Sequence, residues 1–179
     1  IDTSDAPVEG NPNAPVKLVL FIDFTCDHCA RAGKNISLLL KEFPKDIAVF
    51  YKNYPLCGHC PSPDVASNEP CCIAALASVC AHRLGNFRAM YDALYRDLES
   101  GREHSIESVS ATAKTAGFNL SAFESCLAST EAGEHIVRDI DAGEHLGITG
   151  TPVLFVNGRR IPNRYLSTAA LKGLVAYIL

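Results

Sequence analysis

The chain has 179 residues, of which 47% are hydrophobic, so it can bury a full core and is close to one domain in length. Lysine and arginine number 16 against 20 aspartates and glutamates, which gives a formal net charge of −4. An acidic chain offers no basic surface, and we expect no nucleic-acid partner. No apolar run reaches the roughly 20 residues that span a bilayer, so the given chain is expected to be soluble.

Cysteine usage points to an oxidising compartment. Eight cysteines are many for a chain of this size in reducing cytosol, where most would have no structural role. We therefore expect a periplasmic or other extracytoplasmic location. The chain starts at Ile1 without a methionine or a signal-type apolar segment, which indicates a mature or trimmed form. A membrane tether in the full-length form is kept as an alternative.

The predicted elements begin after residues 1–13, a polar segment with prolines and a glycine that we expect to be a flexible lead-in. Residues 16–24 are nearly continuous apolar, as in a strand that is covered on both faces. Apolar residues at helical spacing follow from Asp27 until Pro44, and residues 47–54 predict a second strand. Together these segments predict a βαβ unit.

A loop, a block of helices and a short hairpin are predicted for the rest of the chain. Residues 55–70 contain four prolines and predict an irregular loop. Helical patterning then recurs between glycine-containing turns, over residues 71–83, 87–98, 106–116, 120–128 and 131–146. The chain ends with a hairpin that turns at Asn157-Gly158, between strands at 153–156 and 159–161, and with a helix over 167–178.

The motif Cys26-Asp-His-Cys29 stands where the buried strand ends and a helix begins. This position places the Cys26 sulfur among unpaired N–H groups at the positive end of the helix dipole, which stabilises a thiolate. A second thiol one helical turn later can resolve a mixed disulfide. The motif therefore predicts Cys26 as nucleophile and Cys29 as resolving thiol. Half of a zinc site, or a structural bridge, is the less favoured alternative.

The two residues between these cysteines act on the thiolate in opposite directions. His28 can donate to the thiolate and favour the reduced form, which would make it a catalytic residue. Asp27 repels the thiolate and would tune the redox potential the other way. An exposed His28 without a role is the alternative.

The Thr151-Pro152 segment, at the start of a predicted strand, is the candidate substrate-binding segment. A cis proline there would expose the backbone of Thr151, on which an extended substrate could add as a strand. From the sequence alone, a trans bond is the more usual interpretation.

The helical block and two motifs, Phe21-Ile-Asp-Phe-Thr-Cys-Asp-His-Cys29 and Gly147-Ile-Thr-Gly-Thr-Pro-Val-Leu-Phe-Val-Asn-Gly158, resemble the DsbA-like branch of the thioredoxin superfamily. The resemblance covers nearly all of residues 14–179. It implies an α/β thioredoxin fold with a helical insertion, in which a cis-proline loop at Thr151 and Pro152 faces the cysteine pair. Members introduce or shuffle disulfides in exported proteins, and a membrane partner of the DsbB or vitamin K epoxide reductase type re-oxidises them.

The resemblance also implies a domain organisation. The thioredoxin-fold domain would comprise residues 14–61 and 136–179, and the inserted helical domain residues 62–135. Two departures leave the oxidising strength open: Asp27 stands where the best known oxidases have proline, and Leu20 stands where many relatives have an acid.

Asp23 and Lys52 are the nearest charged residues that could lie beneath the cysteine pair. A buried acid there could take the proton of Cys29 during resolution. The favoured interpretation is a strand-end aspartate and an edge-facing lysine, because charged side chains are usually exposed.

A second C-x-x-C motif, Cys57-Gly-His-Cys60, has the same four residues as the active site of protein disulfide isomerase. Prolines follow it at once, so no helix is expected to begin at Cys57 and stabilise a thiolate. A second catalytic centre, or a zinc site with Cys71 and Cys72, is therefore less favoured than bridges across the loop. We expect Cys57 and Cys60 to pair with Cys71 and Cys72 in an order that the sequence leaves open.

The remaining cysteines, Cys80 and Cys126, each lie in a predicted helix. DsbA-like proteins often join two helices of the insertion at such positions, so the resemblance implies a Cys80–Cys126 bridge. Buried free thiols are the alternative.

The sequence thus predicts an extracytoplasmic thiol:disulfide oxidoreductase, with net oxidation of exported proteins that carry free thiols favoured over reduction or isomerisation. A reductase or isomerase of the same fold is one alternative, and a non-catalytic thioredoxin-fold module that binds ligands or metals is another. We expect a monomer without a cofactor or a metal.

Overall fold

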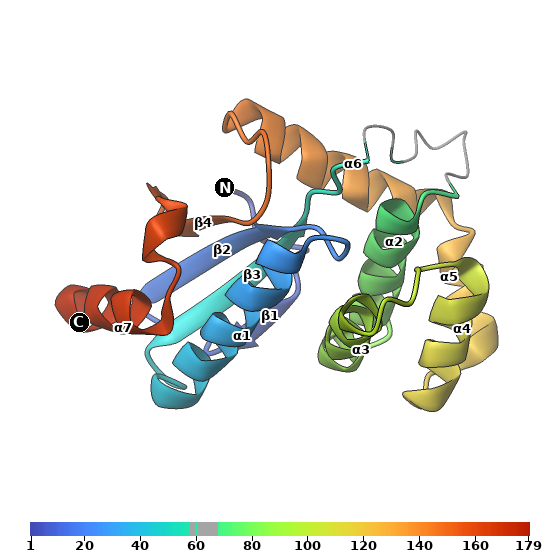
Figure 1. Cartoon of the computed structure of the whole chain (residues 1–179), viewed down its shortest axis with the longest axis horizontal. Helices are drawn as coiled ribbons and strands as arrows, with labels where there is room; N and C mark the ends of the chain where they lie inside the picture. Colours follow the sequence, from blue (N-terminus) through green and yellow to red (C-terminus); the bar gives the residue numbers. More distant parts are fainter. Residues whose placement is uncertain (58–59, 61–67) are drawn as a thin grey trace.

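The computed structural model describes residues 1–57, 60 and 68–179, which form a five-stranded sheet with helices around it (Figure 1). The strands lie in the order β1-β3-β2-β4-β5. Strand β2 is central, parallel to β3 and antiparallel to β4. The strand bounds are β1 Val8–Gly10, β2 Val16–Ile22, β3 Ile47–Asn53, β4 Val153–Val156 and β5 Arg159–Ile161.

Some helices pack against the sheet, and others form a separate group beside it. Figure 1 shows α2 to α5 gathered to one side of the sheet, while α6 runs back towards it and contacts β3. Across the described ranges, no helix is both long and apolar enough to cross a membrane. The helix bounds are α1 Asp27–Glu42, α2 Pro70–Arg83, α3 Phe87–Glu99, α4 Ile106–Thr115, α5 Leu120–Leu127, α6 Thr130–His145, the 3-10 helix η1 Asn163–Tyr165 and α7 Thr168–Ile178.

Strand β2 separates two apolar clusters because successive side chains of a strand point to opposite faces. Leu18 and Leu20 belong to the larger cluster, which also contains residues of α1 and α3. Val19 and Phe21 belong to the cluster on the other face, with residues of β3 and β4. The predicted strand covered on both faces is confirmed, and the five-stranded sheet with a group of helices beside it has the α/β architecture with a helical insertion that the resemblance implies.

The expectation of a flexible lead-in over residues 1–13 is wrong at Val8–Gly10. These residues form β1, which pairs antiparallel with β3 from Val8 opposite Phe50 to Gly10 opposite Ala48. Three residues are too few to show a periodic pattern, and Gly10 has the positive φ of 84° that marks a turn. The proposed domain division remains a prediction; its boundary between residues 135 and 136 falls inside α6.

The end of α6 is fixed to the sheet by Tyr54, which follows β3. The Tyr54 ring packs on Gly143, where an added Cβ would lie 2.6 Å from the ring. The Tyr54 hydroxyl donates a hydrogen bond of 2.7 Å to the carbonyl oxygen of Ile148. Glycine at position 143 therefore permits a close approach between α6 and Tyr54, just before the segment that leads to Pro152.

Candidate active site

Cys26 occupies the N-cap position of α1, directly after the loop that leaves β2. Its carbonyl oxygen accepts backbone hydrogen bonds from Cys29, at 3.0 Å, and from Ala30, at 3.1 Å. Cys26 is half-buried and Cys29 is buried, and both are free thiols. The first sulfur is therefore accessible at the helix N-terminus, while the second lies beneath it in the core.

The pKa values of the two thiols are shifted in opposite directions. Hydrogen bonding to the Cys29 thiol, and further bonds from the backbone of Cys29 and from Thr151, lower the pKa of Cys26 to about 5 although partial burial opposes this. Burial, followed by the hydrogen bond to Cys26, raises the pKa of Cys29 well above its ordinary value. Near neutral pH the pair therefore holds a single negative charge, on Cys26.

The Thr151–Pro152 peptide bond is cis, as the resemblance implies. The carbonyl oxygen of Thr151 lies 3.6 Å from the Cys26 Sγ and accepts from the thiol when it is protonated. Pro152 is buried and Thr151 is half-buried. Two segments 125 residues apart in sequence are thus in contact at the exposed sulfur.

Asp27 and His28 lie on the exposed first turn of α1. The His28 Nδ1 lies 2.7 Å from the Arg31 Nη2. Because guanidinium only donates, Nδ1 must accept, which leaves the ring proton on Nε2. Within the described contacts, the His28 ring is joined to Arg31 and not to Cys26. Arg31 was missed at the sequence level, although its spacing of three residues from His28 on one helix is a usable signal.

A groove of about 510 Å³ runs beside the cysteine pair. His28 and Arg31 line it from α1, Thr151 and Pro152 from the cis-proline loop, and Arg164 from η1. The lining as described contains three basic residues and no acidic one. An extended segment of another protein could lie in this groove with its backbone beside Thr151.

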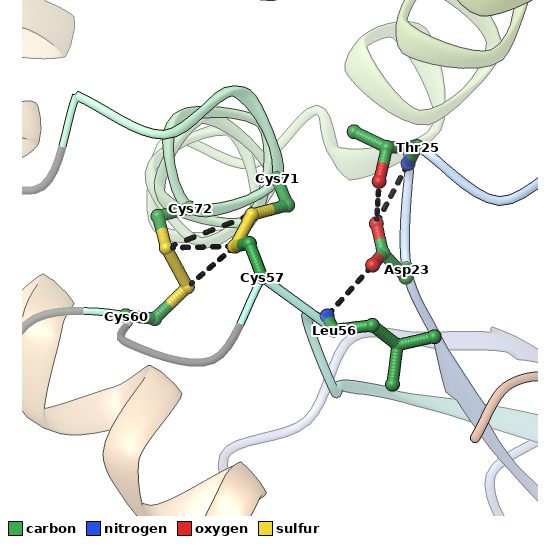
Figure 2. The surroundings of a disulfide bond; sticks show 7 residues. All are labelled: Asp23, Thr25, Leu56, Cys57, Cys60, Cys71 and Cys72. Atoms are coloured by element: carbon green, nitrogen blue, oxygen red, sulfur yellow. Dashed lines mark hydrogen bonds between the residues drawn. A yellow bond between two sulfur atoms is a disulfide. The ribbon is translucent and has the colours of Figure 1, made fainter.

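Asp23 lies beneath the pair, and both of its carboxylate oxygens accept hydrogen bonds from neighbouring loop residues. One carboxylate oxygen accepts from the backbone N–H and the hydroxyl of Thr25, both at 2.7 Å, and the other from the backbone N–H of Leu56 at 2.8 Å (Figure 2). The Asp23 backbone N–H lies 3.5 Å from the Cys29 Sγ, to which it donates. Asp23 therefore fixes the loop under the site. Its expected exposure is wrong, since it is 3% exposed.

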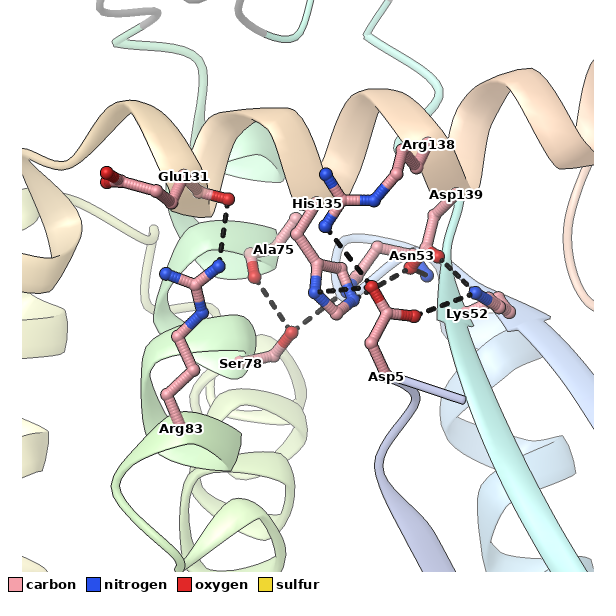
Figure 3. A network of polar contacts seen from close by, with 10 residues as sticks. All are labelled: Asp5, Lys52, Asn53, Ala75, Ser78, Arg83, Glu131, His135, Arg138 and Asp139. Carbon is pink, nitrogen blue, oxygen red and sulfur yellow. Dashed lines mark hydrogen bonds and ion pairs between the residues drawn. The ribbon is translucent and has the colours of Figure 1, made fainter. Parts of the chain in front are cut away.

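Lys52 is also buried, against the expectation of an edge-facing side chain, because it has an internal partner (Figure 3). Its Nζ lies 2.8 Å from the Asp139 carboxylate of α6 and 3.6 Å from Asp5. The other Asp139 oxygen accepts from the backbone N–H of Asn53 at 2.8 Å. Burial raises the pKa of Asp139 to about 6 despite the lysine. The sequence carries no local signal for this pair, whose members are 87 residues apart.

The other six cysteines form three disulfides, Cys57–Cys71, Cys60–Cys72 and Cys80–Cys126. The first two join the loop after β3 to the first turn of α2, and the third joins α2 to α5. The central residues of Cys57-Gly-His-Cys60, and the two prolines after it, lie outside the described residues. Cys57 itself is bridged to α2 and does not begin a helix.

Solved structures place this architecture among DsbA-like thioredoxin folds. A thioredoxin-like oxidoreductase from Silicibacter pomeroyi DSS-3 matches with a TM-score of 0.80 and 24% identity, over 97% of this chain and 92% of its own. Oxidised BdbD from Bacillus subtilis matches with a TM-score of 0.78 and 20% identity, over 99% and 94%. Likeness at this level of identity establishes the fold.

A family model described as Thioredoxin matches residues 2–175, and the chain belongs to that family. Probable disulfide bond formation protein D from Bacillus anthracis is 26% identical over 156 residues, which cover 83% of this chain and 68% of that protein. The Na(+)/H(+) antiporter NhaA 3 from Salinispora tropica is 28% identical over 160 residues, or 89% of this chain and 23% of the antiporter. The chain spans about a quarter of the length of the antiporters it matches.

The acidity of Cys26 can be measured by alkylation. In the reduced protein, the rate of iodoacetamide modification of Cys26 should rise with pH around a midpoint near 5, because the thiolate is the reactive species. Cys29→Ala should move the midpoint upwards, since it removes the Cys29 thiol, which is the main stabilising donor. Mass mapping identifies the site, and a Cys26→Ser control should lack the fast phase. A Cys26 midpoint near 8.5 would contradict the assigned geometry.

The Lys52–Asp139 pair can be tested by a double-mutant cycle. Lys52→Met leaves the Asp139 carboxylate buried without its cation, and we expect a loss of about 3–5 kcal/mol in the free energy of unfolding. Asp139→Asn, which keeps an acceptor for Asn53, should also destabilise because the Lys52 ammonium loses its nearer carboxylate and keeps only Asp5, at 3.6 Å. Urea unfolding at pH 7 should show that the double variant loses clearly less unfolding free energy than the sum of the two single losses. Additive losses would mean that the two groups do not interact.

Proposed function

We propose that the chain is a thiol:disulfide oxidoreductase that oxidises exported proteins through a Cys26–Cys29 redox couple. The observation that carries the proposal is the asymmetry of the pair: Cys26 is accessible with a pKa near 5, and Cys29 is buried with a raised pKa. Because the Cys26 thiol is far more acidic than an ordinary cysteine, its thiolate is stable in the reduced form, and the corresponding disulfide is a strong oxidant. This acidity supports oxidation over reduction.

In the proposed reaction, a substrate thiolate attacks the Sγ of Cys26 in the oxidised enzyme. The Cys26–Cys29 bond breaks, and the Cys29 sulfur leaves and takes a proton. A second substrate thiolate then attacks the substrate sulfur of the mixed disulfide and expels Cys26 as a thiolate. The substrate loses two electrons and the enzyme gains them. A membrane re-oxidant of the DsbB or vitamin K epoxide reductase type would accept these electrons.

The groove and the disulfides support the remaining parts of the proposal. An extended substrate would lie along Thr151 and Pro152, beside the exposed sulfur. His28 would donate to the thiolate from Nε2, the tautomer that its contact with Arg31 favours. Three disulfides suit an extracytoplasmic location. A relative named probable disulfide bond formation protein D supports the same direction of reaction.

Trapping of mixed disulfides tests the roles of the two cysteines. Cys29→Ser should accumulate covalent complexes with substrate proteins that contain scrambled disulfides, because the Cys26 thiolate still attacks a substrate disulfide and expels one of its sulfurs, while intramolecular resolution by Cys29 is lost. Non-reducing gels and mass mapping report the complexes, and Cys26→Ser serves as the control that should trap few. Complexes attached through Cys57 would show that the site has been misassigned.

The residues between the cysteines should tune the reduction potential. Asp27→Pro removes a carboxylate near the thiolate at a position where proline suits a helix, so the disulfide should become more oxidising by about 20 mV, equivalent to roughly 1 kcal/mol. His28→Ala should lower the potential by a similar amount. Equilibration with glutathione measures both, and Arg31→Ala should shift the potential in the same direction as His28→Ala. An unchanged potential in Asp27→Pro would mean that the carboxylate does not act on Cys26.

A further inference from the structure

Four sulfur atoms from two disulfides form one cluster at the start of α2 (Figure 2). The Sγ atoms of Cys57, Cys60, Cys71 and Cys72 all lie within 4.8 Å of one another. Between atoms that are not bonded, the distances are 3.3 Å for Cys57 to Cys72, 3.7 Å for Cys57 to Cys60 and 3.8 Å for Cys71 to Cys72. The two bridges are therefore in van der Waals contact along three edges.

These spacings match those of a tetrahedral metal site. A zinc ion bound by four thiolates at about 2.3 Å places neighbouring sulfurs about 3.8 Å apart. Three of the six edges of the sulfur cluster already lie near this length. Two others are the disulfide bonds, which lengthen to that separation when they are reduced.

Cys71 and Cys72 are adjacent in sequence, which is an unfavourable spacing for two zinc ligands. The first turn of α2 nevertheless brings both sulfurs into the cluster. They lie in the first turn of α2, after Pro70, and both are buried. Their sulfurs nevertheless lie 3.8 Å apart and face the loop that carries Cys57 and Cys60. The positive end of the helix dipole favours thiolates at this position.

A path to the cluster is present. A cavity of about 500 Å³ is lined by Cys57 and Cys71 and by Thr25, Arg102 and His104. A cation can therefore reach two of the four sulfurs from solvent. The cavity lining also includes the acidic residues Asp23, Glu69 and Glu103, which outnumber Arg102 and favour the entry of a cation.

We propose that reduction of Cys57–Cys71 and Cys60–Cys72 converts this cluster into a tetrathiolate binding site for Zn²⁺. Two dithiol molecules each transfer two electrons to one disulfide, which yields four cysteine thiols and two oxidised dithiols. Zn²⁺ then binds the four sulfurs and displaces four protons. The oxidised chain has two structural bridges there, and the reduced chain has a metal centre of the same connectivity between loop and helix.

Zinc stoichiometry tests the proposal, and a Cys26→Ser/Cys29→Ser background removes the other dithiol. The protein is reduced anaerobically with a phosphine, freed of reductant and mixed with Zn²⁺; mass spectrometry of the metal should find one equivalent. The oxidised protein should retain none. Adding Cys71→Ser/Cys72→Ser should abolish retention, whereas the matched change Cys80→Ser/Cys126→Ser should not. Co²⁺ in place of Zn²⁺ should give the visible spectrum of a tetrahedral thiolate complex.

Circular dichroism will show whether a cysteine-to-serine variant fails to fold. A second measurement tests the proposal without substituting the four clustered cysteines. In the reduced, folded Cys26→Ser/Cys29→Ser protein, zinc should slow the alkylation of Cys57, Cys60, Cys71 and Cys72 relative to the zinc-free protein, and it should leave the alkylation of Cys80 and Cys126 unchanged. The proposal is overturned if the folded, reduced protein retains clearly less than one equivalent. It is also overturned if zinc is retained without Cys71 and Cys72, or if these four cysteines are not protected.

Discussion

The structure depends on the difference in burial between two sulfur atoms one helical turn apart. Cys26 sits at the N-cap of α1, where backbone N–H groups face it, and Cys29 points into the core beneath. Because α1 starts just beyond the end of β2, a strand buried on both faces, the sheet positions the backbone that carries both sulfurs. The fold thus assigns the charge of the pair to the accessible sulfur, and the cis-proline loop and the basic groove surround that charge.

The elements with strong periodicity were predictable, and so was the first half of the site. The apolar run at 16–24 followed by Cys26-Asp-His-Cys29 contains both the strand and the start of the helix. The hairpin at Asn157-Gly158 was equally visible, and Asn157 has the positive φ of 46° that such turns require. These features are local, so a few neighbouring residues determine them.

Features that join distant segments were not predictable. Strand β1 exists only because β3 offers it an edge, and the burial of Lys52 depends on Asp139 of α6. Arg164 reaches the groove through η1, which has no periodic pattern. The order of pairing among the four clustered cysteines also required coordinates, because the loop before α2 allows either cysteine of the first pair to meet either of the second.

The contacts of Tyr54 have a consequence for the geometry of the cysteine pair. Tyr54 holds α6 through Gly143 and holds the chain at Ile148 through its hydroxyl, three residues before Thr151. The cis-proline loop is therefore held at both ends: on one side by β4 in the sheet, and on the other by Tyr54, which directly follows β3. The distance between Thr151 and the Cys26 sulfur therefore depends on both of these contacts. A substitution at Gly143 would displace the contact with Tyr54 and so alter the width of the groove beside Thr151.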